Sequence, residues 1–549
     1  MNKFKKILIY ESFLILLFFL TYCNEIKKDQ VKSGTNESEY TLGNAYLDVN
    51  GLEEAKQHFE KGLLLLHSFE YWDAADAFLA AQKIDPDLVM AYWGEAMTYN
   101  HGLWRGQDYE KGVDALKKLG ESQEIRLGKA KSTLEKDLLE SVEILYGEGT
   151  KFERDQAYSS FMGKLYKKYP ENHEVAAFYA LSLLGSVKEG RDEDIYEKGA
   201  IVAQGILKEN PGHPGALHYL IHSYDDPYNA FKALEAADSY SEVAKDAAHA
   251  LHMPSHIYVA MGMWNKVVSS NEISYQASVN RMERKGLDNK ARGYHYFYWL
   301  MYGYLQQGKF DKAQDMMKQM QEFSKDPPTT GARSYMIQMT ATYLVETDRW
   351  EDASIRDHEV SLENLNISAR TLYAFLRGMA QLKNGDIPGV ESTIESMQDD
   401  RKLAIGRMEN RAVAGCGGSW KYEFPNQVDI NQAEVMQLEL SALVENAKEN
   451  LPEAEELIKK AVALEENTSY SFGPPTVAIP SYELYGKWLL DQNRPEEAIS
   501  AYEKALERGP NRILALKGLK SAYDATNNTE KSSEIEAKIL EFQKAGQST

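Results

Sequence analysis

Cysteine is almost absent from this chain of 549 residues, which contains only Cys23 and Cys416. If Cys23 is used up at the N-terminus, no disulfide can form, and stability must come from packing alone. Basic residues are also few, since 62 Lys and Arg face 83 Asp and Glu, and the net charge is −21. A chain this acidic repels phosphate backbones, so we expect no nucleic-acid partner. Strand-like alternation is scarce as well, and helical periodicity dominates from Gly51 on.

The N-terminus carries an apolar segment that is short for a membrane span. Three lysines precede an apolar core at residues 13–20, whereas a spanning helix needs about 20 apolar residues. This layout predicts a secretory signal peptide over residues 1–22. The sequence LTYC at residues 20–23 resembles a bacterial lipoprotein box, in which the cysteine is diacylated and becomes the first residue. The resemblance implies lipidation of Cys23, although Tyr22 stands where a small residue is usual.

The residues after Cys23 bear on localisation. Asn24, rather than an aspartate, follows the cysteine, and the lipoprotein resemblance then favours sorting to the outer membrane. We expect an outer-membrane lipoprotein of the bacterial cell envelope, with a plain membrane anchor or a secreted form as the alternative. Residues 23–50 are polar and rich in Lys and Glu, and they predict a flexible tether.

Two segments at opposite ends of the chain share one spacing of small, aromatic and proline residues. The residues are Gly62, Ala74, Phe78, Ala81 and Pro86 in the first segment, and Gly486, Ala498, Tyr502, Ala505 and Pro510 in the second. This spacing resembles the tetratricopeptide repeat (TPR), a 34-residue helix–turn–helix unit. The small residues let two helices approach closely, the aromatic ring fills the gap and the proline ends the second helix. We therefore predict an all-α, TPR-like α-solenoid of antiparallel helix pairs.

Weaker copies of this repeat lie between the two ends. We place a soft boundary near residue 330, between an N-terminal TPR-like block over residues 51–330 and a C-terminal TPR-like block over residues 331–549. TPR helices stack into a superhelix whose concave groove is lined by the first helix of each pair. The resemblance implies a protein or peptide partner in this groove, and the negative charge of the chain favours a basic one.

Six of the twelve histidines fall within 44 residues of the N-terminal block. They are His213, His218, His222, His249, His252 and His256. His218 and His222 are four residues apart, and so are His252 and His256, which puts each pair on one face of a helix. His213 belongs to a turn rich in Pro and Gly, and we expect His249 to face solvent.

The repeat register brings histidines from three helices together. We expect successive first helices over residues 211–224, 248–261 and 294–306. The TPR resemblance then implies that one groove is faced by His222, His252, His256 and His295. His218 lies one turn before His222, and Asp226 lies near the end of the same helix.

Converging imidazoles with a carboxylate are ligands for Zn²⁺ or another first-row transition metal. We therefore predict a metal site made of His218, His222, His252, His256, Asp226 and His295. A metal held in this way can lower the pKa of a bound water and promote hydrolysis. A polar ligand pocket without metal and structural hydrogen bonding are the alternatives, because neither histidine pair encloses the glutamate of an HExxH motif.

Four further residues are weaker candidates. His67, Glu95 and His101 would extend the histidine cavity, but helix packing is the favoured interpretation. Glu483 would close the groove from the C-terminal block, although an ordinary surface acid is favoured.

The joint presence of HPGxxH and HMPSH motifs on a TPR background resembles a group of exported bacterial TPR proteins, and this resemblance bears on the fold only. Two functions stay open, a binding scaffold and a metal-dependent, hydrolase-like enzyme. The scaffold is favoured because no catalytic signature is complete.

Overall fold

A computed structural model describes residues 40–325, 329–409 and 425–545. The predicted signal peptide, Cys23 and Cys416 lie outside the described residues. The chain divides into two compact units, residues 1–41 and residues 42–549, and all the elements below belong to the second.

Helices form nearly all of the regular structure in the described residues. The first of them are α2 (Glu53–His67), α3 (Tyr71–Ile84), α4 (Val89–Thr98), α5 (Tyr109–Leu119), α6 (Gln123–Gly128), α7 (Thr133–Leu145), α8 (Lys151–Lys168), α9 (His173–Gly185) and α10 (Glu193–Glu209). A short antiparallel ribbon of β1 (Asn100–His101) and β2 (Gly106–Gln107) encloses the 3₁₀ turn η1 (Gly102–Trp104).

The middle of the chain contains shorter helices and two more 3₁₀ turns. These elements are α11 (Pro214–Ser223), η2 (Ala230–Ala233), α12 (Leu234–Val243), α13 (Ala248–His252), α14 (Pro254–Ala260), α15 (Trp264–Lys285), η3 (Asn289–Ala291), α16 (Tyr294–Gln306) and α17 (Phe310–Phe323). The remaining helices are α18 (Thr330–Thr347), α19 (Ala353–Arg356), α20 (Ile367–Lys383), α21 (Ile387–Glu409), α22 (Gln427–Ala447), α23 (Leu451–Glu466), α24 (Ser481–Asp491), α25 (Pro495–Arg508), α26 (Ile513–Ala525) and α27 (Thr529–Ala545).

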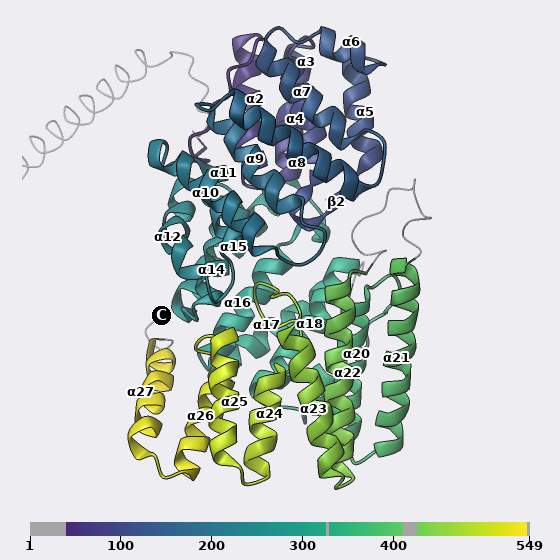
Figure 1. The fold of residues 1–549 in the computed structure, drawn as a ribbon, viewed down its shortest axis with the longest axis vertical. Coiled ribbons are helices and arrows are strands. Elements are labelled where there is room, and N and C mark those ends of the chain that lie inside the picture. The colour runs from purple at the N-terminus through teal and green to yellow at the C-terminus, as the bar shows by residue number, and fades with distance from the viewer. Residues whose placement is uncertain (1–39, 326–328, 410–424, 546–549) are drawn as a thin grey trace, which may run out of the picture. The chain divides into compact units, whose positions relative to one another are not determined.

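Each helix packs mainly on its neighbours in the sequence. The pairs α2 with α3, α9 with α10, α22 with α23 and α24 with α25 are in direct contact. Because only a few residues join the helices of such a pair, the two must run antiparallel. Figure 1 shows these pairs stacked along the chain. The prediction of an all-α, TPR-like array of helix pairs is therefore confirmed.

The packing at Phe78 shows why the repeat needs glycine. A Cβ added at Gly62 would lie 2.7 Å from the Phe78 ring, and one added at Gly94 would lie closer still. The ring is fully buried between the two glycines. Tyr502 occupies the same place near the C-terminus, where a Cβ added at Gly486 would lie 2.8 Å from its ring. The spacing shared by the two ends thus reflects one mode of helix packing.

Substituting Gly94 tests this packing. We expect Gly94→Ala to lower the free energy of unfolding by about 1–3 kcal/mol, because the held Phe78 ring cannot move aside. The matched control is Gly205→Ala in α10, where an added Cβ meets no atom within 4 Å. There alanine should raise the free energy of unfolding by up to about 1 kcal/mol. Urea denaturation followed by circular dichroism measures both values, and equal effects would contradict the proposed role of Phe78.

The segment predicted as a tether is partly folded. Leu42, Leu47 and Val49 are buried, and the Tyr46 backbone N–H donates to Glu174 Oε1 at 3.2 Å. The prediction of a flexible tether over residues 23–50 is therefore wrong for residues 42–50. These apolar side chains lie close together at the end of a longer polar segment, so the composition of the whole segment hid their packing.

The C-terminal helices fold back onto the middle of the chain. The Trp264 indole donates to the Asn511 carbonyl at 2.9 Å, and Arg512 donates to the Tyr302 hydroxyl at 2.7 Å. In Figure 1 the teal helices α14 and α16 lie between the blue N-terminal helices and the yellow-green C-terminal ones. Residues 42–549 form one compact unit, and the boundary predicted near residue 330 stays a prediction.

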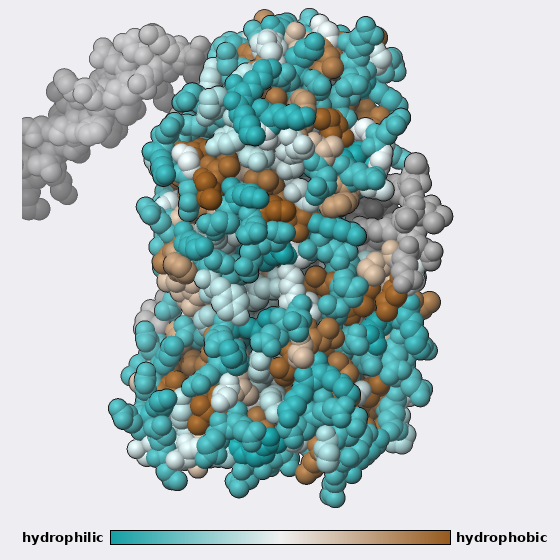
Figure 2. Space-filling view, viewed as in Figure 1, coloured by the Kyte–Doolittle hydropathy of each residue, from teal (hydrophilic) through white to brown (hydrophobic). Residues whose placement is uncertain are grey.

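One face of the molecule is largely hydrophilic. Figure 2 shows a mainly teal face with scattered brown patches, in keeping with the net charge of −21. Among the described residues, no helix combines the length and the apolar character needed to cross a bilayer.

Candidate metal centre

Four helices place the histidines at the centre of the second unit. His218 and His222 lie on α11, His249 and His252 on α13, His256 on α14 and His295 on α16. Helix α11 begins with Pro214 at its first position, and the His213 ring caps it by accepting the Ala216 N–H at 3.2 Å. This cap agrees with the turn role predicted for His213.

The helix predicted over residues 248–261 is two helices. Pro254 has no N–H to donate, and it starts α14 directly after α13. His252 and His256 lie on either side of this junction, with ring centroids 5.1 Å apart. The His249 ring lies 5.1 Å from that of His218 on α11. The expectation that His249 faces solvent is therefore wrong, since it joins the cluster at its partly exposed edge.

Five imidazoles form a ring, which we call the histidine ring. Its members are His218, His222, His256, His252 and His249, and successive ring centroids lie 4.9, 5.1, 5.1, 6.0 and 5.1 Å apart around the circuit. His295 lies outside the circuit, 4.5 Å from His252. The histidines of the three helices predicted over residues 211–224, 248–261 and 294–306 thus lie close together.

Hydrogen bonds fix the tautomer of four of these rings. His218 Nδ1 donates to the His67 carbonyl at 2.7 Å, and His252 Nδ1 donates to Asn271 Oδ1 at 2.7 Å. The Asn271 oxygen is identified as the acceptor because its amide nitrogen donates to the Val267 carbonyl at 2.8 Å. Each Nδ1 therefore carries the proton, and each Nε2 carries a lone pair.

The other two rings share one carboxylate. His222 Nδ1 and His256 Nδ1 donate to the same oxygen, Asp225 Oδ2, at 3.0 and 3.1 Å. The second Asp225 oxygen is bonded to the Arg191 guanidinium. Burial alone would raise the pKa of Asp225, but Arg191 and the two imidazole N–H groups hold that pKa well below its usual range. Asp225 is thus ionised and orients one ring from α11 and one from α14.

The Nε2 atoms of the histidine ring have no hydrogen-bond partner among the described residues. The atoms concerned are buried and belong to His218, His222, His249, His252 and His256. A buried nitrogen lone pair without a donor is costly, and here several belong to rings that contact one another. Burial also lowers the pKa of His218, His249 and His252 well below the usual range and that of His256 to about 4, so these rings are neutral near pH 7.

This donor set fits a transition metal. The ligand atoms of His218, His222 and His249 lie within 4.8 Å of one another, and so do those of His252, His256 and His295. In a tetrahedral zinc site, bonds of about 2.1 Å put neighbouring ligand nitrogens about 3.4 Å apart, so only small ring movements are needed. The groups that accept from Nδ1 are the His67 carbonyl, Asn271 and Asp225. Metal-bound histidines usually donate their other ring N–H to a carbonyl or carboxylate of this kind.

A second group of histidines nearby has a different character. His67 Nε2 lies 2.6 Å from Glu174 Oε2, and His213 Nε2 lies 3.2 Å from Glu174 Oε1. His67 Nδ1 also lies 2.8 Å from the Tyr219 hydroxyl. Every ring nitrogen of this pair is bonded, so the group is structural, and the His67 carbonyl positions His218. The packing interpretation predicted for His67 agrees with these contacts.

A segment of the C-terminal half covers the histidine ring. The Phe472 ring lies 4.7 Å from His256 and 5.9 Å from His222. Gly473 follows with a φ of +97°, and a side chain there would collide with Trp299, which stacks on His256 at 4.7 Å. Sequence reasoning found no signal for this contact, because Phe472 is more than two hundred residues from the histidines.

The other predicted residues lie elsewhere or have other roles. Asp226 caps the turn after α11 by accepting the Tyr228 and Asn229 N–H groups. The position beside the cluster that we predicted for Asp226 is occupied by Asp225. Glu95 accepts from Gln82 at 2.7 Å and pairs with Lys118, as expected of helix packing. His101 stacks on Tyr71 at 3.9 Å.

The prediction for Glu483 as a surface acid is wrong. It is buried and accepts both Arg512 Nε at 2.5 Å and Arg512 Nη2 at 3.0 Å. Arg512 also pairs with the buried Glu346 at 2.9 Å. This network ties α24 and α26 to α18, so Glu483 holds the C-terminal helices in place and does not reach the histidine ring.

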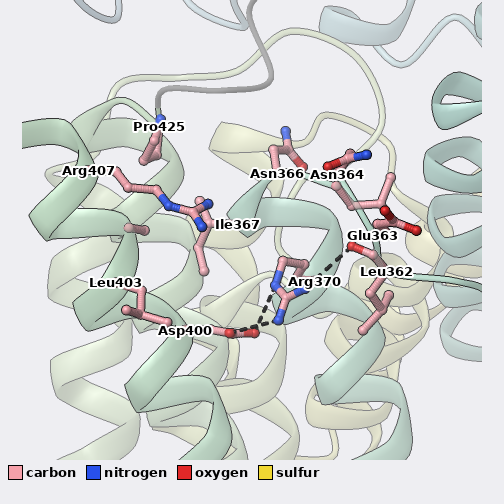
Figure 3. Close-up of a pocket in the computed structure, with 12 residues that line it drawn as sticks. Leu362, Glu363, Asn364, Asn366, Ile367, Arg370, Asp400, Leu403, Arg407 and Pro425 are labelled. Carbon is pink, nitrogen blue, oxygen red and sulfur yellow. Dashed lines mark hydrogen bonds and ion pairs between the residues drawn. The ribbon is translucent and has the colours of Figure 1, made fainter. Parts of the chain in front are cut away.

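A cavity of about 230 Å³ lies away from the histidines, between α20 and α21. Figure 3 shows its lining, in which Arg370 is held by Asp400 through Nε at 3.0 Å and Nη2 at 2.8 Å. Because the guanidinium is already matched by a carboxylate, the cavity offers no unpaired charge at this position. The histidine ring is the stronger candidate site.

Comparisons with known proteins add no functional assignment. The sequence matches no protein-family model and no curated protein. Among solved structures, the TPR domain of P58(IPK) is 14% identical, with 87% of this chain and 99% of that chain covered and a TM-score of 0.19. Yeast Tom70 is 14% identical, with 87% and 96% covered and a TM-score of 0.31. Human IFIT1 in its dimer with PPP-AAAA is 12% identical, with 89% and 90% covered and a TM-score of 0.33.

Proposed function

We propose that this chain is an envelope-anchored helical-repeat scaffold whose function centres on a transition metal bound by the histidine ring. One observation carries the proposal: four neighbouring imidazoles with fixed tautomers have buried Nε2 lone pairs that find no hydrogen-bond partner among the described residues. Coordination to metal satisfies such lone pairs, whereas structural hydrogen bonding leaves them unmatched.

The residues around the ring support a metal over a peptide at this position. Phe472 and Trp299 cover the faces of His256, so an extended peptide would have to displace the covering segment. That segment is held by the Ser469 hydroxyl, which accepts the Arg191 N–H at 2.9 Å. A small ion needs no such rearrangement. A protein partner, which we still propose for the repeat array, would bind on another part of its surface.

The donor set favours zinc or another first-row transition metal that accepts imidazole nitrogen, such as copper, iron or nickel. When bound, such an ion acts as a Lewis acid and lowers the pKa of a coordinated water. Asp225 and Asn271 hold the Nδ1 protons and thereby keep the Nε2 lone pairs available. The apolar rings of Phe472 and Trp299 exclude bulk water from one side.

Metal analysis of protein purified without a histidine tag tests this proposal. We expect zinc, iron, copper or manganese in near-stoichiometric amount, and we expect His222→Ala and His252→Ala to lose at least tenfold in metal affinity. His173→Ala is the matched control, because His173 lies on α9 and its ring contacts Glu209 at 3.0 Å. Metal-free protein whose melting temperature is unmoved by added divalent ions would rule the centre out.

Membrane attachment is the second part of the proposal and rests on the N-terminal sequence. The signal layout and Cys23 support a lipid anchor in the outer membrane. We expect Cys23→Ala to shift the protein from the membrane fraction to the soluble fraction of the envelope. An unchanged distribution would exclude the lipid anchor without bearing on the metal centre.

A further inference from the structure

The candidate ligands divide into two sets of three. One set contains His218, His222 and His249, and the other contains His252, His256 and His295. In each set the ligand atoms lie within 4.8 Å of one another. The first set combines rings from two helices, α11 and α13, and the second combines rings from three, α13, α14 and α16.

We propose that the histidine cluster holds two metal ions, one in each three-histidine set, and that a small anion such as hydroxide completes their coordination. This inference rests on the proposed function, since it presumes that the cluster binds metal. It adds the number of ions, the ligands of each ion and the class of exogenous ligand.

A single ion held by one set leaves the donors of the other set unused. An ion placed where the two sets meet would take His222 and His256, whose ring centroids are 5.1 Å apart. His218 and His252 would then keep buried, unpartnered Nε2 atoms, although their tautomers present these lone pairs to the interior. Two ions use the lone pairs of both sets, so the orphaned atoms favour two ions.

Asp225 links the two sets. Its Oδ2 accepts Nδ1–H of His222 from the first set and of His256 from the second, at 3.0 and 3.1 Å. One carboxylate therefore orients a ligand of each ion from the outer sphere. Such an arrangement keeps the two ions at a fixed spacing, as two-metal centres require.

Charge balance indicates the exogenous ligand. Imidazole coordinates a metal in its neutral form, and the negative charge of Asp225 is matched by Arg191. Two divalent ions would bring four positive charges into a buried region, which is costly without an anion. Three protein ligands also leave each ion with an open coordination position, as in catalytic zinc sites. Hydroxide formed from a bound water, or another small anion, would occupy these positions and offset part of the charge.

Titration of metal-free, tag-free protein with Co²⁺ tests the number of ions. We expect two ions per chain, and one ion per chain in each of His249→Gln and His295→Gln, which remove a ligand from a different set. Both side chains are partly exposed, so these substitutions leave no buried cavity, and circular dichroism checks the fold. His173→Gln is the control and should keep two ions.

The outcomes separate the two proposals. No bound ion in the wild type would overturn both the proposed function and this inference. One ion in the wild type would overturn the inference alone and leave the metal centre standing. Two ions with loss of one in each variant would support it.

Sodium azide probes the exogenous ligand on the Co²⁺-loaded protein. Azide should replace hydroxide or water and change the visible absorption spectrum, with saturation as azide increases. If azide leaves the spectrum unchanged up to high millimolar concentration, the ions have no open coordination position, and this part of the inference is wrong. The same titration on His249→Gln should give a smaller change, because one ion is missing.

Discussion

Asp225→Asn is expected to lower metal affinity at least tenfold and to lower the free energy of unfolding of the metal-free protein by about 3–5 kcal/mol. In the native protein one Asp225 oxygen accepts from His222 and His256 and the other accepts from Arg191. In asparagine one of these oxygens becomes an NH₂ group, so a donor would face either the imidazole N–H groups or the guanidinium. Arg191 would also lose its main counter-charge in a buried place.

Metal analysis and urea denaturation measure the two effects separately. Asp226→Asn is the comparison variant, because the neighbouring carboxylate caps a turn through Oδ1, which an amide oxygen can replace, and its Oδ2 makes only a longer contact with Arg191 Nη2, at 3.3 Å. We expect the control to change the free energy of unfolding by about 1 kcal/mol or less and to leave metal content unchanged. If Asp225→Asn bound metal as the wild type does, the two imidazoles would not depend on the shared carboxylate for their orientation.

The sequence was sufficient for the fold because the repeat signal is local. The positions around Phe78 and Tyr502 lie within one helical hairpin, so their spacing in the sequence translates directly into packing. The same reasoning failed where packing is long-range. Leu42 and Val49 are buried against distant helices, and Glu483 is buried because Arg512 lies beside it.

The histidines could be predicted in part. Two pairs four residues apart place their rings on one helical face, and the structure brings both pairs together. His249 was missed because its place in the cluster depends on the long-range contact between its ring and that of His218 on α11. The sequence does not tell whether Asp225 or Asp226 points towards the histidines. The two residues are adjacent at the end of a helix, and the directions of their side chains depend on the turn that follows.

Acidification of the metal-free protein from pH 6.5 to pH 5 is expected to lower its free energy of unfolding by several kcal/mol. The pKa of an unfolded histidine is about 6.5, whereas burial lowers the pKa of His256 to about 4 and that of His218 and His252 well below the usual range. Between these values the unfolded chain binds protons that the folded chain does not. Stability is therefore complete above about pH 6.5 and falls as the pH decreases.

The size of the effect follows from the number of rings. Each buried histidine contributes about 1.4 kcal/mol per pH unit below pH 6.5, so the four members of the histidine ring with a lowered pKa contribute about 5–6 kcal/mol per pH unit. Urea denaturation at pH 7, 6 and 5 measures this slope, and His256→Gln should reduce it by about 1.4 kcal/mol per pH unit. Carboxylates with ordinary pKa values near 4 add little in this range. A free energy of unfolding that stays constant from pH 7 to pH 5 would mean that the folded cluster takes up protons as readily as the unfolded chain, and the rings would then not be held as neutral metal ligands.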